Sequence, residues 1–256
     1  MTITGAIGRF FNGIILFIVR MLALSKIHPN MLTLFGLLIN IGAAWLLAVG
    51  SFRWAGVVII GAGLFDMVDG RVARETNQVT KFGGFFDSVL DRYSDLGLLV
   101  GLLVWYGSIN RSAYVVLTSV AMMGCVMVSY TRARAENTIP SCKVGFMERP
   151  ERIVLFMIGA FTNRMAGVLW VILVLSVTTV ANRIHYTYLA LNNRPVPRGS
   201  NPLSAFFWRA FFWTDARTTI PYDIWVIAIL AFVWLVPPDW LRDPTASGLG
   251  LLGYFF

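Results

Sequence analysis

Long, nearly uncharged apolar runs dominate this sequence and decide what it can fold into. Of its 256 residues, 57% are hydrophobic and only 13% are charged, whereas soluble domains average about 25% charged residues. A soluble fold would therefore have too few polar side chains to cover its surface. Runs of about 20 apolar residues cross a bilayer as helices, and the short alternating segments of a membrane barrel are missing. The sequence predicts an all-α polytopic membrane protein.

Turns and charged loops divide the apolar sequence into a core of six predicted transmembrane helices at 28–191. Before this core, residues 1–27 contain an apolar stretch that is bracketed by arginines and too short to span, so we expect an interfacial amphipathic helix. After it, an extension at 192–256 begins with an interfacial loop rich in arginine, proline and aromatic residues, and contains an apolar run at 222–236. That run is either a seventh span or a re-entrant segment. The six predicted spans cover 31–49, 53–75, 83–106, 112–136, 151–162 and 166–190.

Lysines and arginines are distributed unevenly between the two ends of the predicted helices. The chain has 21 of them against 13 acidic residues, a net charge of +8, and most lie in the N-terminal segment and in the loops on its side of the membrane. The positive-inside rule places that side in the cytoplasm, in a multi-pass protein of the cell membrane. Basic loops there favour anionic lipids and anionic substrates as partners. Nucleic acid is disfavoured, because the charges surround membrane helices and do not line one soluble face.

Four aspartates at the cytoplasmic ends of the second and third predicted helices are the strongest functional signal. Asp66 and Asp69 are spaced i, i+3, and Asp87 and Asp91 are spaced i, i+4, so each pair lies on one helix face. A carboxylate inside a membrane costs roughly 2.5–3.5 kcal/mol even on the mildest scale, so this cluster needs cations. Oxygen ligands on facing helices suit Mg²⁺ or Mn²⁺, and paired carboxylates suit two ions about 3.5–4 Å apart. All four aspartates are predicted metal ligands.

Arginines and glycines close to the aspartates refine this prediction. Ion pairing with neighbouring arginines is the alternative to metal binding, and it explains one carboxylate better than four. Gly70 directly follows Asp69, and Gly83 precedes Asp87 by one helical turn. A helical glycine costs roughly 1 kcal/mol relative to alanine, so these glycines indicate either close approach of a ligand or tight packing of helices. Arg74 lies one turn after Gly70, where it is placed to hold a phosphate.

The aspartates and glycines together form the pattern D-x2-D-G-x2-A-R-x8-G-x3-D-x3-D. At every fixed position this resembles the motif of the CDP-alcohol phosphatidyltransferase family, and the resemblance extends from about Pro29 to about Arg183. It implies the six-helix core of that family, a homodimer, and transfer of a phosphate-linked alcohol from a CDP carrier to a second alcohol with release of CMP. The fixed positions are Asp66, Asp69, Gly70, Ala73, Arg74, Gly83, Asp87 and Asp91.

The resemblance also implies a role for each matched residue. The first three aspartates would ligate the metal ions, and Asp91 would complete that site. Asp91 would in addition be the general base that deprotonates the acceptor hydroxyl, since such a base must reach the attacking oxygen. The residues implied to bind the CDP moiety are Gly70, Arg74 and Gly83.

The acceptor is indicated by the strings SYTRARAE at 129–136 and CKVGFMERPER at 142–152. They resemble the phosphatidylinositol phosphate synthase branch of the family, which implies CDP-diacylglycerol as donor and inositol phosphate as acceptor. Guanidinium groups bind phosphate in a bidentate manner, although pairing with nearby glutamates is the alternative. Glycerol 3-phosphate is the rival phosphorylated polyol. The residues implied to bind the acceptor phosphate are Arg132, Arg149, Arg152 and Arg183.

Two other classes of function fit part of the pattern. An intramembrane prenyltransferase also places two aspartate motifs around Mg²⁺ and pyrophosphate, but it commonly repeats an aspartate where this chain has Gly70 and Ala73. A cation transporter would use the carboxylates as its ion site and would leave Gly70, Arg74 and the arginine cluster without a role. The sequence therefore favours phosphatidyl transfer to a phosphorylated polyol.

Overall fold

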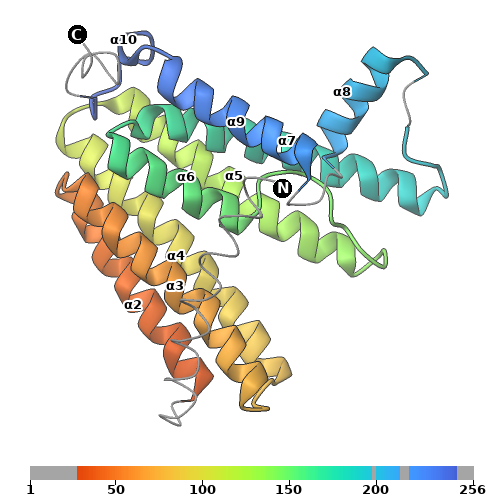
Figure 1. Cartoon of the computed structure of the whole chain (residues 1–256), viewed down its shortest axis with the longest axis horizontal. Helices are drawn as coiled ribbons and strands as arrows, with labels where there is room; N and C mark the ends of the chain where they lie inside the picture. The colour runs from red at the N-terminus through yellow and green to blue at the C-terminus, as the bar shows by residue number, and fades with distance from the viewer. Residues whose placement is uncertain (1–27, 198–199, 214–218, 247–256) are drawn as a thin grey trace.

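The computed structural model of this chain describes residues 28–197, 200–213 and 219–246. Within these ranges every regular element is a helix and no strand is formed (Figure 1). The interfacial helix predicted at 1–27 lies outside the described residues. The helices are α2 (Pro29–Ala48), α3 (Phe52–Glu75), α4 (Lys81–Ser108), α5 (Ser112–Glu136), α6 (Arg149–Thr162), α7 (Met165–Leu191), α8 (Pro202–Phe212), α9 (Ile220–Leu235) and α10 (Pro238–Leu241).

Three of these helices, α2, α5 and α7, are long and apolar enough to cross a membrane by length and composition. The helices that carry the aspartates are as long, with 24 residues in α3 and 28 in α4, and their charged residues gather at the ends that the α3–α4 turn joins. α9 is a shorter apolar helix. The prediction of an all-helical membrane fold is confirmed.

The helices form two packed groups that meet along α3 and α4 (Figure 1). In the first group α2 packs against both α3 and α4, and in the second α7 packs against both α5 and α6. Contacts of α3 with α6 and of α4 with α5 join the groups. One buried cluster continues through both, and it includes Ile59, Leu98, Phe156 and Leu169. This junction brings the ends of α3 and α4 close to the start of α6.

Local sequence signals fix the turn between the two aspartate helices. Thr80 caps α4, because its hydroxyl oxygen accepts a hydrogen bond from the Gly83 amide at 2.9 Å. Such caps satisfy donors that the first helical turn leaves unpaired. After α3 ends at Glu75, Asn77 adopts a left-handed φ of 54°, which Asn tolerates better than most residues. The tight reversal makes α3 and α4 antiparallel and places their aspartates at the same end of the bundle.

The extension packs onto the second helix group as α8, α9 and α10. α9 is one continuous helix of 16 residues, and its two ends lie beside the two ends of α6. Near its start, the Tyr222 hydroxyl donates to Glu151 at 3.0 Å, and just after its end the Val236 carbonyl accepts from Arg164 at 2.8 Å. α9 therefore approaches both ends of α6, but with 16 residues it is shorter than the three helices that are long enough to cross a membrane. Whether it is a seventh span or a re-entrant segment stays a prediction.

The contact between α2 and α4 depends on a glycine. A Cβ added at Gly101 would lie 2.3 Å from the backbone oxygen of Ala44. Gly101→Ala is therefore expected to lower the free energy of unfolding by about 1–3 kcal/mol, because the two backbones must separate. Gly97→Ala on the same helix is the control, since a Cβ there meets nothing within 4 Å. Thermal unfolding in detergent measures both, and equal midpoints would contradict this close contact.

Candidate metal and anion site

Three aspartates from the joined ends of α3 and α4 form one carboxylate cluster. Asp66, Asp69 and Asp87 each place a carboxylate oxygen within 4.8 Å of the others. Asp69 is buried, and its Oδ1 accepts a hydrogen bond from the Gly70 amide at 2.5 Å. Its Oδ2 is also buried and has no hydrogen-bond partner among the described residues.

This carboxylate cluster fits a divalent cation. All its donors are carboxylate oxygens, the ligands that Mg²⁺ and Mn²⁺ prefer. A buried oxygen without a partner costs about 1–3 kcal/mol, and more when it is charged, so Asp69 Oδ2 needs a cation or a donor. The prediction was that both aspartate pairs face each other across the two helices, and the geometry brings Asp66, Asp69 and Asp87 together in this way. Their role as metal ligands stays a prediction.

Asp91 lies one turn further along α4 and contacts Arg149 at the start of α6. Its Oδ1 is 3.0 Å from Arg149 Nη2, while Arg149 Nη1 forms a short hydrogen bond with Asp66. Arg149 Nε is also 3.5 Å from Asp95. Asp91 is not among the three residues whose oxygens all lie within 4.8 Å of one another, but its side chain contacts Asp66, and Arg149 pairs with both residues. Sequence reasoning looked for cations among the neighbouring arginines of α3 and α4, whereas this one comes from a distant helix.

Asp95 is a site residue to which sequence reasoning gave no role. It is buried, and its Oδ2 lies 2.5 Å from Nη2 of Arg152, which is 3% exposed. The Nε and Nη1 groups of Arg152 are buried without a hydrogen-bond partner in the described part of the chain. Asp95 follows Asp91 at i, i+4, so it continues the same helix face, and this spacing was the available signal. Arg152 is held by one carboxylate, and its other two donor groups are enclosed without a protein acceptor among the described residues.

A cavity of about 350 Å³ opens beside this ion-pair network. It lies between α4, α5, α6 and the end of α7, and guanidinium groups outnumber carboxylates in its lining, which favours an anionic ligand. The structure therefore brings all the arginines expected to bind the acceptor phosphate to one cavity that also contains Asp91. The charged residues of the lining are Asp91, Arg92, Asp95, Arg132, Glu136, Glu148, Arg149, Arg152 and Arg183.

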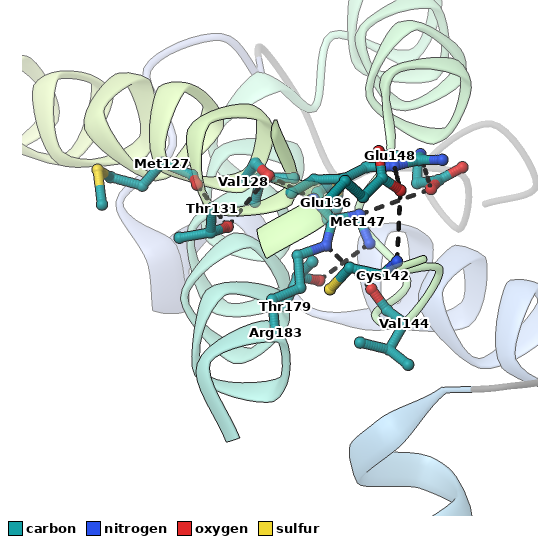
Figure 2. A network of polar contacts seen from close by, with 11 residues as sticks. Met127, Val128, Thr131, Glu136, Cys142, Val144, Met147, Glu148, Thr179 and Arg183 are labelled. Atoms are coloured by element: carbon teal, nitrogen blue, oxygen red, sulfur yellow. Dashed lines mark hydrogen bonds and ion pairs between the residues drawn. The ribbon is translucent and has the colours of Figure 1, made fainter. Parts of the chain in front are cut away.

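Arg132 and Arg183 are held more tightly at this cavity than the sequence indicated. Arg132 contacts Glu136 at 3.1 Å and Glu148 at 2.9 Å. Figure 2 shows Arg183 between two backbone carbonyls: its Nε donates to Val144 at 3.0 Å, and its Nη1 forms a short hydrogen bond with Val128. Its Nη2 lies 3.5 Å from Glu148. Arg183 thereby ties the end of α5 to the loop before α6.

The two motif glycines have different surroundings. A Cβ at Gly83 would lie 3.0 Å from Thr80 Oγ1 and 3.3 Å from Asn30 Oδ1, so close packing with the cap and with α2 explains this glycine. At Gly70 the nearest atom is the flexible Arg74 guanidinium at 3.6 Å, so protein packing does not require a glycine. Among the described residues Arg74 has no carboxylate within ion-pair distance. Gly70 and Arg74 therefore leave room and charge for a ligand phosphate.

Comparisons with known proteins match the region that contains this site. The family model for CDP-alcohol phosphatidyltransferase matches residues 26–184. The chain is 34% identical over 167 residues to the phosphatidylinositol phosphate synthase of Mycobacteroides abscessus, covering 61% of this chain and 76% of that protein. It is 35% identical over 167 residues to the archaetidylinositol phosphate synthase of Pyrococcus horikoshii, covering 65% of this chain and 86% of that protein.

Solved structures of the phosphatidylinositol phosphate synthase of Mycobacterium tuberculosis are similar in fold. The structure with CDP-DAG bound gives a TM-score of 0.63 at 30% identity, covering 67% of this chain and 92% of that one. The complex with manganese and citrate gives 0.64 at 28% identity, covering 73% and 96%. The family match ends at residue 184, before the extension at 192–256 begins.

Proposed function

The chain belongs to the CDP-alcohol phosphatidyltransferase family and is a membrane transferase, and we propose that it transfers a phosphatidyl group from CDP-diacylglycerol to inositol phosphate. In this reaction the acceptor hydroxyl oxygen bonds to the lipid-bearing phosphorus, and the bond from that phosphorus to CMP breaks. The products are phosphatidylinositol phosphate and CMP. The observation that carries the proposal is the cavity where Asp91 and the buried, partly unpaired guanidinium of Arg152 lie together.

The residues divide this work between donor and acceptor. Asp66, Asp69 and Asp87 are proposed to hold Mg²⁺ or Mn²⁺, as two ions, in keeping with the paired carboxylates. When bound, the metal would neutralise charge on the diphosphate and on the departing CMP. Arg74 beside Gly70 is proposed to hold a phosphate of the CDP group, next to the cap at Gly83. Asp91 takes the proton of the acceptor hydroxyl.

Inositol phosphate is favoured over glycerol 3-phosphate because of the relatives and the cavity. The relatives named above differ in the lipid part of their names, phosphatidyl against archaetidyl, but share inositol phosphate. The cavity offers Arg149 and Arg152 beside Asp91, with Arg132 and Arg183 on its other side, to a phosphorylated acceptor. An unphosphorylated acceptor such as inositol would bring no anion to the arginines of this cavity.

The location and the assembly of the protein are part of the proposal. The site lies at the end of the bundle that bears the basic loops, so the positive-inside rule supports a cytoplasmic site in the cell membrane. The family resemblance supports a homodimer.

The test is CMP release from CDP-diacylglycerol by the purified protein with Mn²⁺ or Mg²⁺. Inositol 1-phosphate, glycerol 3-phosphate and unphosphorylated inositol are offered separately. We expect release with inositol 1-phosphate to exceed that with the other two. Release with glycerol 3-phosphate alone would transfer the assignment to that acceptor. If no CMP were released with any phosphorylated polyol, the proposal would be refuted. The remaining candidates would then be a prenyltransferase, which releases pyrophosphate, and a cation transporter.

Arg152→Lys is expected to raise the KM for inositol phosphate by roughly 10- to 100-fold, because one charge-assisted hydrogen bond is worth about 1.5–3 kcal/mol. Lysine keeps a cation for Asp95 but loses the guanidinium fork. The KM for CDP-diacylglycerol should stay within about twofold. Arg134→Ala is the control, because this exposed arginine of α5 does not line the cavity. Equal changes in both KM values would argue against an acceptor phosphate at Arg152.

A further inference from the structure

The extension lies outside the family match, yet it makes hydrogen bonds to the back of the acceptor cavity. Those bonds reach three places in the core: the first turn of α6, the loop before α6, and the last part of α7. Each of these places also supplies residues that line the cavity. The extension therefore touches the elements that carry the arginines without lining the cavity itself.

The first contact is made by Tyr222 at the start of α9. Its hydroxyl donates to Glu151 Oε1 at 3.0 Å, and both residues are buried. Glu151 does not line the cavity, whereas Arg149 and Arg152 on the same helical turn do. Tyr222 therefore holds the first turn of α6 on the side away from the cavity, while Arg149 and Arg152 of the same turn face the cavity.

The second and third contacts come from the end of α8. The Phe212 carbonyl accepts from the Gly145 amide at 3.1 Å, and the Phe211 carbonyl accepts a short hydrogen bond from the Asn182 side chain. Asn182 directly precedes Arg183 in α7. Gly145 lies in the loop that leads to Glu148, and its φ of +90° requires a glycine. These bonds hold both the part of α7 that carries Arg183 and the loop whose Val144 carbonyl accepts from the Arg183 guanidinium.

Aromatic packing connects the three contacts. Phe146 of the loop lies 4.4 Å from the Trp213 ring and 5.7 Å from the Tyr222 ring, measured between centroids. All three residues are buried. Aromatic pairs at about such centroid distances each stabilise the fold by roughly 0.5–1.5 kcal/mol beyond the burial of their area. The end of α8, the start of α9 and the loop before α6 thus form one packed unit behind the cavity.

We infer that the extension is a positioning element of the acceptor site, in which Tyr222 orients the first turn of α6 and the end of α8 orients the loop and the α7 end around the acceptor phosphate. This inference rests on the proposed function. Bidentate recognition of phosphate depends on the direction of the guanidinium group as well as its charge. A displacement of about 1 Å is enough to impair a site of this kind. The extension acts through Glu151 and Asn182 and does not touch the reacting atoms.

Tyr222→Phe tests the inference by removing only the hydroxyl. We expect the KM for inositol phosphate to rise on the order of tenfold, the value of one hydrogen bond to a charged group. The kcat and the KM for CDP-diacylglycerol should remain within about twofold. The matched control is Tyr114→Phe, because Tyr114 also donates to the C-terminal segment, at the Leu241 carbonyl, but contributes nothing to this cavity. A merely structural contact would shift thermal unfolding in both variants without separating the two KM values.

Two further variants keep the inference testable even if Tyr222→Phe does not fold. In a Glu151→Ala background, Tyr222→Phe should have no additional effect on the acceptor KM, because the coupling has already been lost. Asn182→Ala should raise the same KM through the α7 contact. If the wild type is active and the KM for inositol phosphate is unchanged in both Tyr222→Phe and Asn182→Ala, the inference is wrong but the proposed function stands. A wild type that releases no CMP would overturn the proposed function and this inference with it.

Discussion

Asp69→Asn is expected to reduce CMP release by at least about 1000-fold and to abolish tight binding of Mn²⁺. Asp69 Oδ2 is a buried carboxylate oxygen without a hydrogen-bond partner among the described residues, and Asp69 has a carboxylate oxygen within 4.8 Å of those of Asp66 and Asp87. The amide removes one negative charge and turns a donor group toward the cation. Loss of a ligand that supplies several kcal/mol of charge stabilisation corresponds to a reduction of this size.

Isothermal titration with Mn²⁺ in detergent measures the binding, and CMP release measures the activity. Glu75→Gln is the control, because Glu75 is an exposed acid at the end of the same helix and lies outside the carboxylate cluster. It should change neither quantity. Wild-type Mn²⁺ affinity in Asp69→Asn would show that the carboxylate cluster is not the metal site, whatever happens to the activity.

Asp91→Asn is expected to lower kcat by roughly 100- to 10,000-fold, the usual contribution of a general base, while CDP-diacylglycerol still binds. Asparagine keeps an oxygen that accepts from Arg149, so the ion-pair network loses a charge but little of its geometry. Asp91 lines the acceptor cavity, as a base for the acceptor hydroxyl must, and it also contacts Asp66 of the carboxylate cluster, so the variant has to be tested for both roles.

Single-turnover CMP release and equilibrium binding of CDP-diacylglycerol separate these roles. Asp239→Asn serves as control, since this exposed residue lies in α10 and lines neither the cavity nor the carboxylate cluster. If Asp91→Asn lost both lipid binding and Mn²⁺ binding, the main role of Asp91 would be that of a metal ligand. The sequence proposed both roles for Asp91, and this pair of measurements decides between them.

The helices were predictable because their signals are local. The predicted spans at 53–75 and 112–136 agree with α3 (Phe52–Glu75) and α5 (Ser112–Glu136). These helix boundaries follow from the apolar runs and from the breaks at Gly50 and before Thr80, which locate the helix ends to within a few residues. The aspartate motif was also readable, since i, i+3 and i, i+4 spacings fix a helix face without knowledge of the fold. The family read from that motif is confirmed by the match over residues 26–184. The roles of the individual site residues stay predictions.

Other parts of the site depend on residues far apart in sequence. Nothing near Asp66 indicated that its guanidinium partner would be Arg149, and nothing near Asp95 indicated Arg152. The arginines were expected to bind phosphate together, but Arg183 proved to be engaged by two backbone carbonyls. Such pairings follow from the rotation and crossing of packed helices, which no local period specifies.

For this protein the sequence by itself determined a helical membrane fold and a cluster of carboxylates that requires cations. Both follow from the cost of placing polar groups in a bilayer, and that cost depends on residue type and local spacing. Only the tertiary structure decided that α6 brings Arg149 between Asp66 and Asp91, and that the extension supports the cavity through Tyr222. The ion pairs exist because packing the two helix groups together buries charged groups that must be paired, and the Tyr222 contact exists because a buried carboxylate needs a hydrogen-bond donor.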